Sequence, residues 1–290
     1  MADSQGEPRH APRLPVSVCI PVRNEERNLP ACIAALGDAF DDIVVVDSRS
    51  TDGTAAVAAA HGARVVPFDW DGRFPKKRTW ALRHVPFVHD WVLFLDADEF
   101  VTPAFVAELC REIPSTRHVG FLLSFANHFM GRPLRHGDRF RKVALFRRDA
   151  GEYEEFPEDA WTNLDMEVHE HPVLRGTIGA IHSPIDHRED RGLHHYIAKH
   201  NEYSTWEANR FRWLRAAPPA AWRQLTARQR FKYRNLDRWW LAKLYYWTSL
   251  VAKCGVLDGP AGWRFAALKR RYFEDIRLKI LEADARDRRS

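Results

Sequence analysis

The feature that most constrains the fold is an alternation of short apolar runs and helical segments through the first hundred residues. Apolar, β-branched runs are expected to form strands at 15–22, 43–46, 63–68 and 91–95. Segments with helical spacing or a high alanine content separate these runs, at 26–36, 54–60 and 76–84. Nearly continuous apolar strands joined by helices predict a parallel sheet that helices cover on both faces. The ligand site of such a sheet lies beyond the carboxyl ends of its strands.

After residue 110 the pattern changes to longer strands and then to helices. Strands are expected at 119–129, 142–147 and 177–187, and helices at 192–216, 222–254 and 261–283. The whole pattern predicts an α/β fold, with a mostly parallel mixed sheet flanked by helices and a C-terminal helical region after it. We expect a flexible tail over 1–13, a catalytic domain over 14–188 and a basic, Trp-rich helical region over 189–290.

The composition excludes several classes of protein. With 29% charged, 45% hydrophobic and 12% aromatic residues, the 290-residue chain has a globular composition. Its four cysteines show no CxxC spacing, so neither a zinc site nor a disulfide framework is predicted, and a reducing compartment fits. The first fourteen residues lack the apolar stretch of a secretory signal. The longest uncharged run of the late apolar segment, 244–252, is far short of the roughly 20 residues that span a bilayer, so no transmembrane helix is expected.

Charge divides the chain into two parts. Residues 190–290 hold 22 Lys and Arg against 10 Asp and Glu, a net charge of +12, whereas residues 1–189 hold 22 against 29, a net charge of −7. The basic part also holds seven of the eleven tryptophans. Basic residues interleaved with Trp and Tyr suit an anionic membrane surface or a nucleic acid. Core packing is the ordinary explanation of the Trp and Leu residues, but it does not explain the excess of Arg and Lys, so we expect this region to dock on an anionic membrane surface.

Carboxylates follow two of the expected strands. Asp47 follows the second strand, where it can accept hydrogen bonds from a nucleobase or a ribose hydroxyl. Asp52 either shares that site or only caps the next helix. Asp96 and Asp98 follow the fourth strand, and in extended chain they point to the same face. Mg²⁺ or Mn²⁺ bridging substrate phosphates would neutralise this pair, and a solvated acidic turn is the alternative.

Three sequence motifs, taken in their order and spacing along the chain, resemble those of glycosyltransferase family 2. They are IPVRNEE at 20–26, VVVDSRSTDGT at 44–54 and LDADE at 95–99. The resemblance covers roughly residues 15–110 and implies the GT-A (Rossmann-like) fold, a nucleotide-diphosphate sugar donor with uridine as the expected base, and an inverting single displacement. Ser48 stands where the family pattern has a second acid, which leaves the division of roles between Asp47 and Asp52 open.

The resemblance also implies roles for individual residues. Pro21, Asn24 and Glu25 border the nucleotide, Asp47 meets the base, and Asp96 and Asp98 hold the ribose, the metal and the diphosphate.

The basic run at 75–81 stands where such enzymes begin a helix beside the nucleotide. We expect Lys77 or Arg78 to reach the donor, although a bare cluster of this kind is usually a solvated face. His187 ends an expected strand and is expected to bind the metal or to donate to the departing diphosphate; a structural histidine is the alternative.

Motifs in the second half resemble the bacterial branch of the family that includes lipopolysaccharide core glucosyltransferases. They are VHE at 168–170, GTIGAI at 176–181, YIAKHNEYS at 196–204 and GVLDGPAG at 255–262. They imply a saccharide acceptor carried on a lipid. An inverting transfer needs a carboxylate within hydrogen-bond reach of the acceptor hydroxyl. We expect Glu170 to be this base, with Asp159 as the alternative because many family 2 enzymes place a Glu-Asp pair at the acceptor side.

These features predict a metal-dependent, inverting glycosyltransferase of cell-envelope polysaccharide synthesis. It would be cytoplasmic and peripheral at the inner face of the bacterial cytoplasmic membrane, with Mg²⁺ or Mn²⁺ as its cofactor. A polyprenyl-phosphate acceptor, or capsule or exopolysaccharide synthesis, is the alternative within this class. A nucleic-acid-binding protein and a catalytically inactive donor-binding domain are the alternatives outside it. No nucleic-acid partner is expected, because the acidic first part would repel phosphate without a metal.

Overall fold

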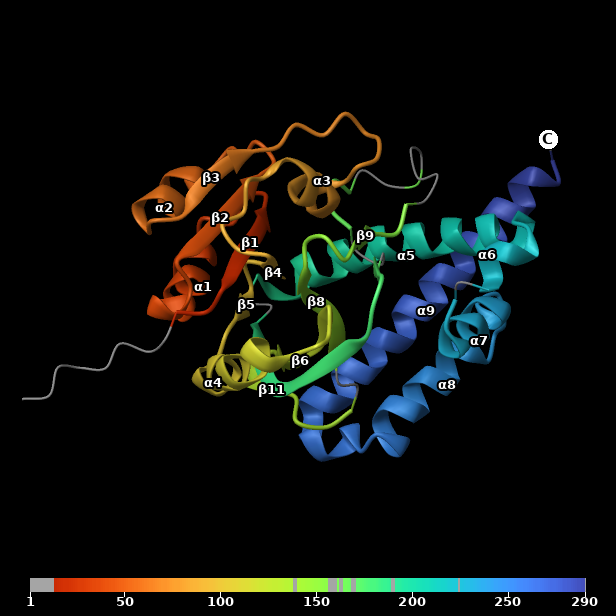
Figure 1. Ribbon diagram of the computed structural model, residues 1–290. Coiled ribbons are helices and arrows are strands. Elements are labelled where there is room, and N and C mark those ends of the chain that lie inside the picture. Colours follow the sequence, from red (N-terminus) through yellow and green to blue (C-terminus); the bar gives the residue numbers. More distant parts are fainter. Residues whose placement is uncertain are drawn as a thin grey trace, which may run out of the picture. The chain divides into compact units, whose positions relative to one another are not determined.

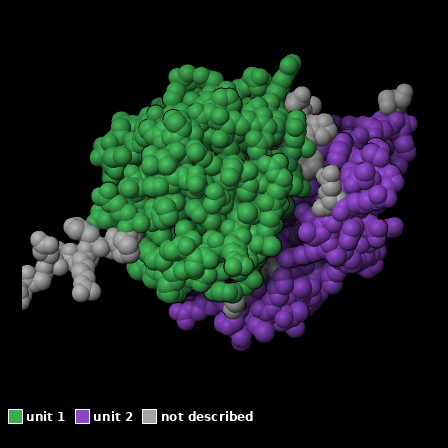
Figure 2. Space-filling view, in the orientation of Figure 1, with its two compact units in different colours: residues 1–126, 140–157, 164–188 green, residues 127–139, 158–163, 189–290 purple. Residues whose placement is uncertain are grey.

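The computed structural model describes residues 13–137, 140–155, 161, 164–167, 171–188, 191–223 and 225–289. Internal contacts divide the chain into two compact units (Figure 2). Unit 1 comprises residues 1–126, 140–157 and 164–188, and unit 2 comprises 127–139, 158–163 and 189–290. Of the expected tail, Arg13 alone is among the described residues, and its guanidinium lies 3.8 Å from the Asp41 carboxylate.

Unit 1 is built on a mixed sheet with the strand order β3-β2-β1-β4-β8-β6-β11-β5 (Figure 1). Its parallel part contains β1 (Val16–Val22), β2 (Asp42–Asp47), β3 (Arg64–Pro67) and β4 (Trp91–Phe94). The later strands pair antiparallel, and they are β5 (Glu99–Phe100), β6 (Gly120–Phe129), β8 (Phe140–Arg147) and β11 (Ile178–Arg188). A two-stranded ladder joins β9 (Gly151–Tyr153) to β10 (Pro172–Leu174). The predicted α/β fold with a mixed sheet is confirmed, and its parallel pairing is confined to the first hundred residues.

Helices connect the parallel strands, as the alternation predicts. They are α1 (Leu29–Leu36), α2 (Thr54–Ala60) and α3 (Lys77–His84). α4 (Pro103–Glu112) follows β5, and short 3-10 turns follow α1 (Gly37–Ala39) and α4 (Ile113–Ser115). The Thr102 hydroxyl accepts the N–H of Phe105 at 3.2 Å, and Pro103 occupies the first turn, where its missing N–H has no helical partner to lose. These two residues explain where α4 begins.

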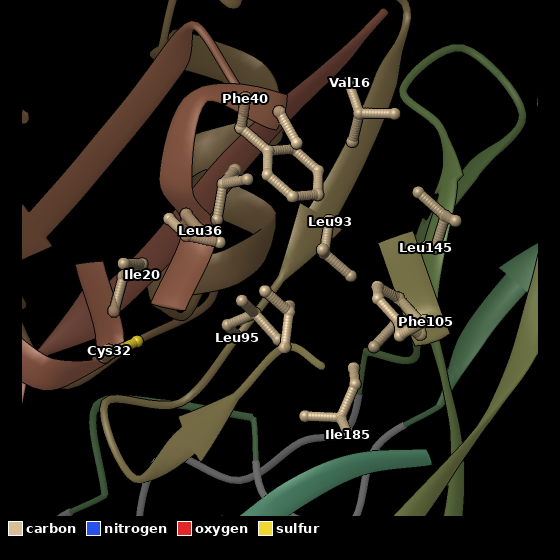
Figure 3. Close-up of a cluster of buried hydrophobic side chains, with 14 of the residues drawn as sticks. Val16, Ile20, Cys32, Leu36, Phe40, Leu93, Leu95, Phe105, Leu145 and Ile185 are labelled. Carbon is tan, nitrogen blue, oxygen red and sulfur yellow. The ribbon is translucent and has the colours of Figure 1, made fainter. Parts of the chain in front are cut away.

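The sheet is buried on both faces, because apolar residues of β1 alternate between two clusters. Val16, Val18 and Ile20 pack with residues of α1 and α4, whereas Cys19 packs on the side of α3. Figure 3 shows the first cluster, in which side chains from α1, β1, β4 and α4 point toward one another. Each large apolar side chain buried in this way stabilises the fold by about 1.5–3 kcal/mol. The core therefore fixes the position of the strand ends that carry the site.

Unit 2 is mainly helical. Its long helices, α5 (Gly192–Ala216) and α9 (Gly259–Asp287), pack along each other, and α8 (Leu241–Trp247) packs on α9. Shorter elements are α6 (Pro219–Arg223), α7 (Ala227–Asn235), a π-helical turn (Thr248–Ala252), a 3-10 turn (Gly255–Asp258) and β7 (Arg132–Pro133), which pairs with the end of β6. Its core contains Phe211, Leu214, Tyr233, Phe273, Ile276 and Ile280.

The prediction of one continuous helix over 222–254 is wrong. The Thr226 hydroxyl accepts the N–H of Gln229, and the Gln229 side chain accepts the N–H of Thr226, so a capping box starts a new helix at α7. A second interruption separates α7 from α8, and α8 ends in the π-helical turn. No Gly or Pro lies in 222–254 to mark these breaks. The expected helix over 261–283 extends over 259–287.

Candidate functional site

The IPVRNEE, VVVDSRSTDGT and LDADE motifs meet at one edge of the sheet of unit 1. Val22, the last residue of β1, pairs with Asp47, the last residue of β2. β4 lies on the other side of β1 and leads directly into Asp96. Since parallel strands bring their carboxyl ends to the same edge, Asp47 and Asp96 both lie at the edge where ligands of such sheets bind.

Asp47 closes a tight turn that also holds Asn24. Its carboxylate accepts the backbone N–H of Ser50 at 3.2 Å and the Ser50 hydroxyl proton. The same hydroxyl oxygen accepts the N–H of Asn24 at 2.8 Å, and the Asn24 side chain accepts the N–H of Thr51 at 2.8 Å. Asn24 has a φ of 57°, a left-handed conformation that Asn adopts more readily than most residues. The loops after β1 and β2 therefore form one hydrogen-bonded network.

Glu25 and Asp52 both contact the start of α2. The Thr54 hydroxyl accepts the N–H of Glu25 at 2.8 Å and donates to Asp52, which also accepts the N–H of Thr54 at 3.1 Å. Burial raises the pKa of the Asp52 carboxyl, but the hydrogen bonds from Thr54 outweigh it and leave this pKa below its ordinary value. Asp52 thus stabilises the helix start, although the N-cap residue is Gly53. Pro21 lies buried inside β1, paired with Val46.

Lys77 and Arg78 are buried, so the alternative of a solvated basic face is wrong. The Lys77 ammonium donates to the carbonyl of Val22 at 2.9 Å and lies 3.1 Å from the Asp165 carboxylate. Burial lowers the pKa of Lys77, and Asp165 opposes that shift. The Arg78 guanidinium lies 2.6 Å from the Asp96 carboxylate. Both cations therefore contact the strand ends that carry the motifs.

Glu167 completes this corner of the site and was not predicted from the sequence. Its carboxylate accepts the N–H of Arg78 and of Thr79, each at 2.9 Å, and its carbonyl accepts the Arg78 guanidinium. The side chain is only 1% exposed. A carboxylate at this point satisfies free N–H groups of the first turn of α3 and interacts favourably with the helix dipole. Glu167 lies in a polar loop whose sequence carries no signal for this contact.

Asp96 and Asp98 lie in a turn between β4 and β5, so the prediction based on extended chain does not hold. The turn gives the two carboxylates different partners. Asp96 contacts Arg78 and, at 3.1 Å, the Lys142 ammonium. The Asp98 carboxylate lies 3.5 Å from Nε2 of His187. The structure thus brings Asp98 and His187 together, as the sequence predicts.

A buried ion pair between Glu99 and Lys142 contacts Asp96. Glu99 is 1% exposed, and its carboxylate lies 2.6 Å from the Lys142 ammonium and accepts the N–H of Asp96 at 3.0 Å. Burial raises the pKa of Glu99, whereas the pKa of Lys142 is raised because Asp96 and Glu99 outweigh its own burial. Lys142 also lies 5.0 Å from the ring centre of Phe125. Sequence reasoning missed Lys142, because nothing in its strand marks it.

Asp98 and His187 offer oxygen and nitrogen atoms of the kind that bind a divalent ion. The pairing of His187 with Glu99 and the 2.9 Å bond from the Arg188 N–H to the Asp98 carbonyl hold the two side chains near each other. Mg²⁺ and Mn²⁺ prefer carboxylate oxygens, and imidazole is a common ligand of first-row metals. No group of three or more His, Cys, Asp or Glu side chains suited to a metal occurs in the part of the chain that the structure describes.

The two expected base candidates, Glu170 and Asp159, lie outside the described residues. Their places relative to the strand ends stay predictions. His171, next to Glu170, donates its N–H to the Glu154 carboxylate at 3.1 Å.

Comparisons with known proteins agree with the motif pattern. The sequence profile described as glycosyl transferase family 2 matches residues 17–166. The lipopolysaccharide core biosynthesis glycosyltransferase LpsC of Rhizobium meliloti is 32% identical over 209 residues, which cover 68% of this chain and 72% of that protein. A TPR repeat-containing protein of Synechococcus elongatus is 40% identical over 84 residues, which cover 29% of this chain and only 20% of that protein.

Among solved structures, the chain is similar to glucosyl-3-phosphoglycerate synthase from Mycobacterium tuberculosis in complex with Mn²⁺, UDP and glucosyl-3-phosphoglycerate. The alignment covers 66% of this chain and 78% of that one, at 20% identity and a TM-score of 0.41. The similarity is partial at this score.

Proposed function

The chain belongs to glycosyltransferase family 2, and we propose that it transfers a sugar, with inversion, from a UDP-sugar to a lipid-linked saccharide. The GT-A fold of this family is the α/β architecture of unit 1. A relative named for lipopolysaccharide core biosynthesis, aligned over 72% of its length, supports an acceptor in cell-envelope polysaccharide synthesis.

The observation that carries the proposal is the placement of Asp47 and Asp96 on either side of the end of β1. Asp47 is preorganised by Ser50 to accept hydrogen bonds from the nucleobase. Asp96, which contacts Arg78 and Lys142, would accept a hydrogen bond from a ribose hydroxyl. Residues bordering the nucleotide are Pro21, Asn24, Glu25 and Asp52.

The departing diphosphate needs positive charge near the same edge. Asp98 and His187 would hold Mg²⁺ or Mn²⁺, which would neutralise the charge that develops on the leaving group. Lys77 and Arg78 add two cations at the start of α3, where the N–H groups of Arg78 and Thr79 are already bound by Glu167. A diphosphate reaching these cations would compete with Asp165 and Asp96 for them.

The transfer itself requires one base. In the proposed step Glu170 accepts the proton of the acceptor hydroxyl while the acceptor oxygen bonds to the anomeric carbon. The bond from that carbon to the diphosphate oxygen breaks, and its electron pair leaves with UDP. Asp159 is the alternative base. Because the proposed acceptor is carried on a lipid, the enzyme would act as a peripheral protein at the inner face of the cytoplasmic membrane.

Substitution of each base candidate tests this assignment. We expect Glu170→Gln to lower kcat by about 10²–10⁴-fold, because it removes the proton acceptor, while the Kd of the UDP-sugar with Mn²⁺ stays within two-fold. Transfer to a lipopolysaccharide-core acceptor and isothermal titration with the donor give the two quantities. Asp159→Asn serves as the matched variant. Loss of kcat in Asp159→Asn alone would move the base to Asp159, and near-normal turnover in both variants would refute the assignment.

A further inference from the structure

Exposed apolar side chains gather in one segment of unit 2. Seven large ones lie between residues 239 and 263, with exposed fractions from 42% to 66%. We call them the apolar rim: Trp239, Leu244, Trp247, Val251, Val256, Leu257 and Trp263. Across all the other residues that the structure describes, nine large apolar side chains are exposed, with fractions from 40% to 71%. A soluble monomer rarely leaves such a concentration uncovered, so the rim marks a contact surface.

The rim is distinct from the packing face of the same helices. On α8, Leu241 and Ala242 are buried, and Tyr245 stacks on Phe273 with 4.0 Å between ring centroids. Lys243 and Trp247 are four residues apart on α8 and so lie along another side of it, and Trp239 lies in the turn just before the helix. The Lys243 ammonium lies 4.8 Å from the ring centre of Trp239, so this ring lies next to the same side of α8. Core packing therefore does not account for the rim tryptophans.

Close packing and hydrogen bonds fix the turn that presents Val256 and Leu257. A Cβ on Gly262 would lie 2.0 Å from the carbonyl oxygen of Gly255, so only glycine fits there. The Asp258 carboxylate accepts the N–H of Arg135 at 3.0 Å and of His136 at 2.9 Å. The GVLDGPAG motif thus has a structural role, which is to hold this turn in one conformation.

The exposed charge of the rim segment is positive. Between residues 239 and 264 the basic residues are Lys243, Lys253 and Arg264, and the acidic one is Asp258. The Asp258 side chain is only 6% exposed and is used within unit 2. A second copy of the chain would bring the same positive charges together. A nucleic acid would match the charge but not the aliphatic side chains of Val251, Val256 and Leu257.

We propose that the apolar rim docks on the surface of an anionic lipid bilayer. Trp247, Leu257 and Trp263 enter the headgroup region, where amphipathic aromatic rings are favoured, and the basic residues contact lipid phosphates. Among the described residues, no helix is long and apolar enough to cross a membrane, so the contact is interfacial. The rim contains no residue of the site in unit 1, and the inference does not depend on the transfer chemistry.

Vesicle co-sedimentation of the full chain tests the proposal. We expect binding to phosphatidylcholine vesicles that contain a quarter phosphatidylglycerol, and at least about ten-fold weaker binding to pure phosphatidylcholine, because three basic residues act near the surface. Trp247→Ala and Trp263→Ala should each weaken binding by about ten-fold, since each removes a large apolar group from the interface. Lys243→Glu should weaken it by at least about five-fold.

Arg228→Glu is the matched control for Lys243→Glu, because it makes the same charge change at an exposed residue of α7 outside the rim. Its binding should stay within two-fold of the unsubstituted chain. Circular dichroism and urea unfolding confirm that each variant is folded, and Leu257→Gln replaces any that is not. Equal binding to neutral and anionic vesicles would overturn the proposal. So would self-association or oligonucleotide binding that the rim variants abolish while vesicle binding persists.

Discussion

At the scale of single residues, Arg78 links parts of the site that are far apart in the sequence. Its guanidinium contacts Asp96 after β4, and its backbone N–H is bound by Glu167, 89 residues later in the chain. Glu167 thereby fixes both the start of α3 and the backbone position from which the Arg78 side chain extends. A substitution of Glu167 should therefore lower the stability of unit 1 more than it changes the rate of the reaction.

We expect Glu167→Gln to lower the free energy of unfolding of unit 1 by about 1–3 kcal/mol, because it leaves buried N–H groups with a weaker acceptor. Glu112→Gln, at an exposed position at the end of α4, is the matched control and should change it by less than about 0.5 kcal/mol. Urea unfolding followed by circular dichroism gives both values. Equal stability of the two variants would show that the cap contributes nothing.

Asp42 gives a prediction about pH. Burial raises the pKa of its carboxyl, but hydrogen bonds from Ser17 at 2.5 Å, from Val88 and from Arg64 outweigh it and hold this pKa below its ordinary value. A lowered pKa contributes stability that is present above the pKa of the unfolded chain, about 4, and is lost as the pH falls through the folded value.

Ser17→Ala should therefore destabilise the protein by about 1–2 kcal/mol at pH 7, and the difference should shrink as the pH falls below about 4. Ser115→Ala, at an exposed position, should show no such difference at either pH. Urea unfolding at pH 7 and near pH 3.5 provides the comparison. A difference that stays constant across this range would mean that Asp42 is not the partner that matters.

At the scale of elements, the sequence predicts short strands best where both faces of the sheet are buried. The alternation in β1, β2 and β4 follows directly from apolar clusters on both faces of the sheet. It also places Asp47 at the end of β2, Asp98 in the turn after β4, and His187 near the end of β11. Lys142 and Glu167 could not be predicted, because their contacts depend on strands and loops that meet only in the folded sheet.

The helix breaks on either side of α7 could not be predicted from the sequence. The capping box at Thr226 and Gln229 lies in a segment without Gly or Pro, so propensity favours one long helix. Close backbone packing has a clearer mark in the sequence, namely the glycines of the GVLDGPAG motif. The structure explains Gly262 by the carbonyl of Gly255, which occupies the space of a side chain.

We expect Gly262→Ala to destabilise unit 2 by about 1–3 kcal/mol, because the new Cβ displaces the turn between α8 and α9. Gly259→Ala is the matched control: its φ of 61° is strained for alanine, but open space surrounds its Cβ position. It should cost about 1 kcal/mol. Thermal unfolding compares the two, and a Gly259→Ala variant as unstable as Gly262→Ala would contradict the packing argument.

At the scale of the whole chain, the net charge of +5 is the sum of two opposed parts. The acidic first part carries Asp47, Asp96 and Asp98 at the sheet edge, where two cationic side chains already pair with Asp96. The basic last part carries the apolar rim. One part is suited to a metal ion and a nucleotide, and the other to an anionic surface, which agrees with an enzyme whose acceptor is held on a membrane.

The measurement that tests the central claim most directly is donor turnover by the purified chain. A panel of nucleotide sugars with Mn²⁺ or Mg²⁺ should show release of a nucleoside diphosphate from one donor, and EDTA should stop it. Asp98→Asn should lower that rate by at least about 100-fold. Asp38→Asn should leave it unchanged, because Asp38 is exposed and lies before the start of β2, whereas the site lies at the end of that strand. Binding of a donor with neither hydrolysis nor transfer would indicate a catalytically inactive domain. Failure to bind or hydrolyse any donor with either ion would contradict the account.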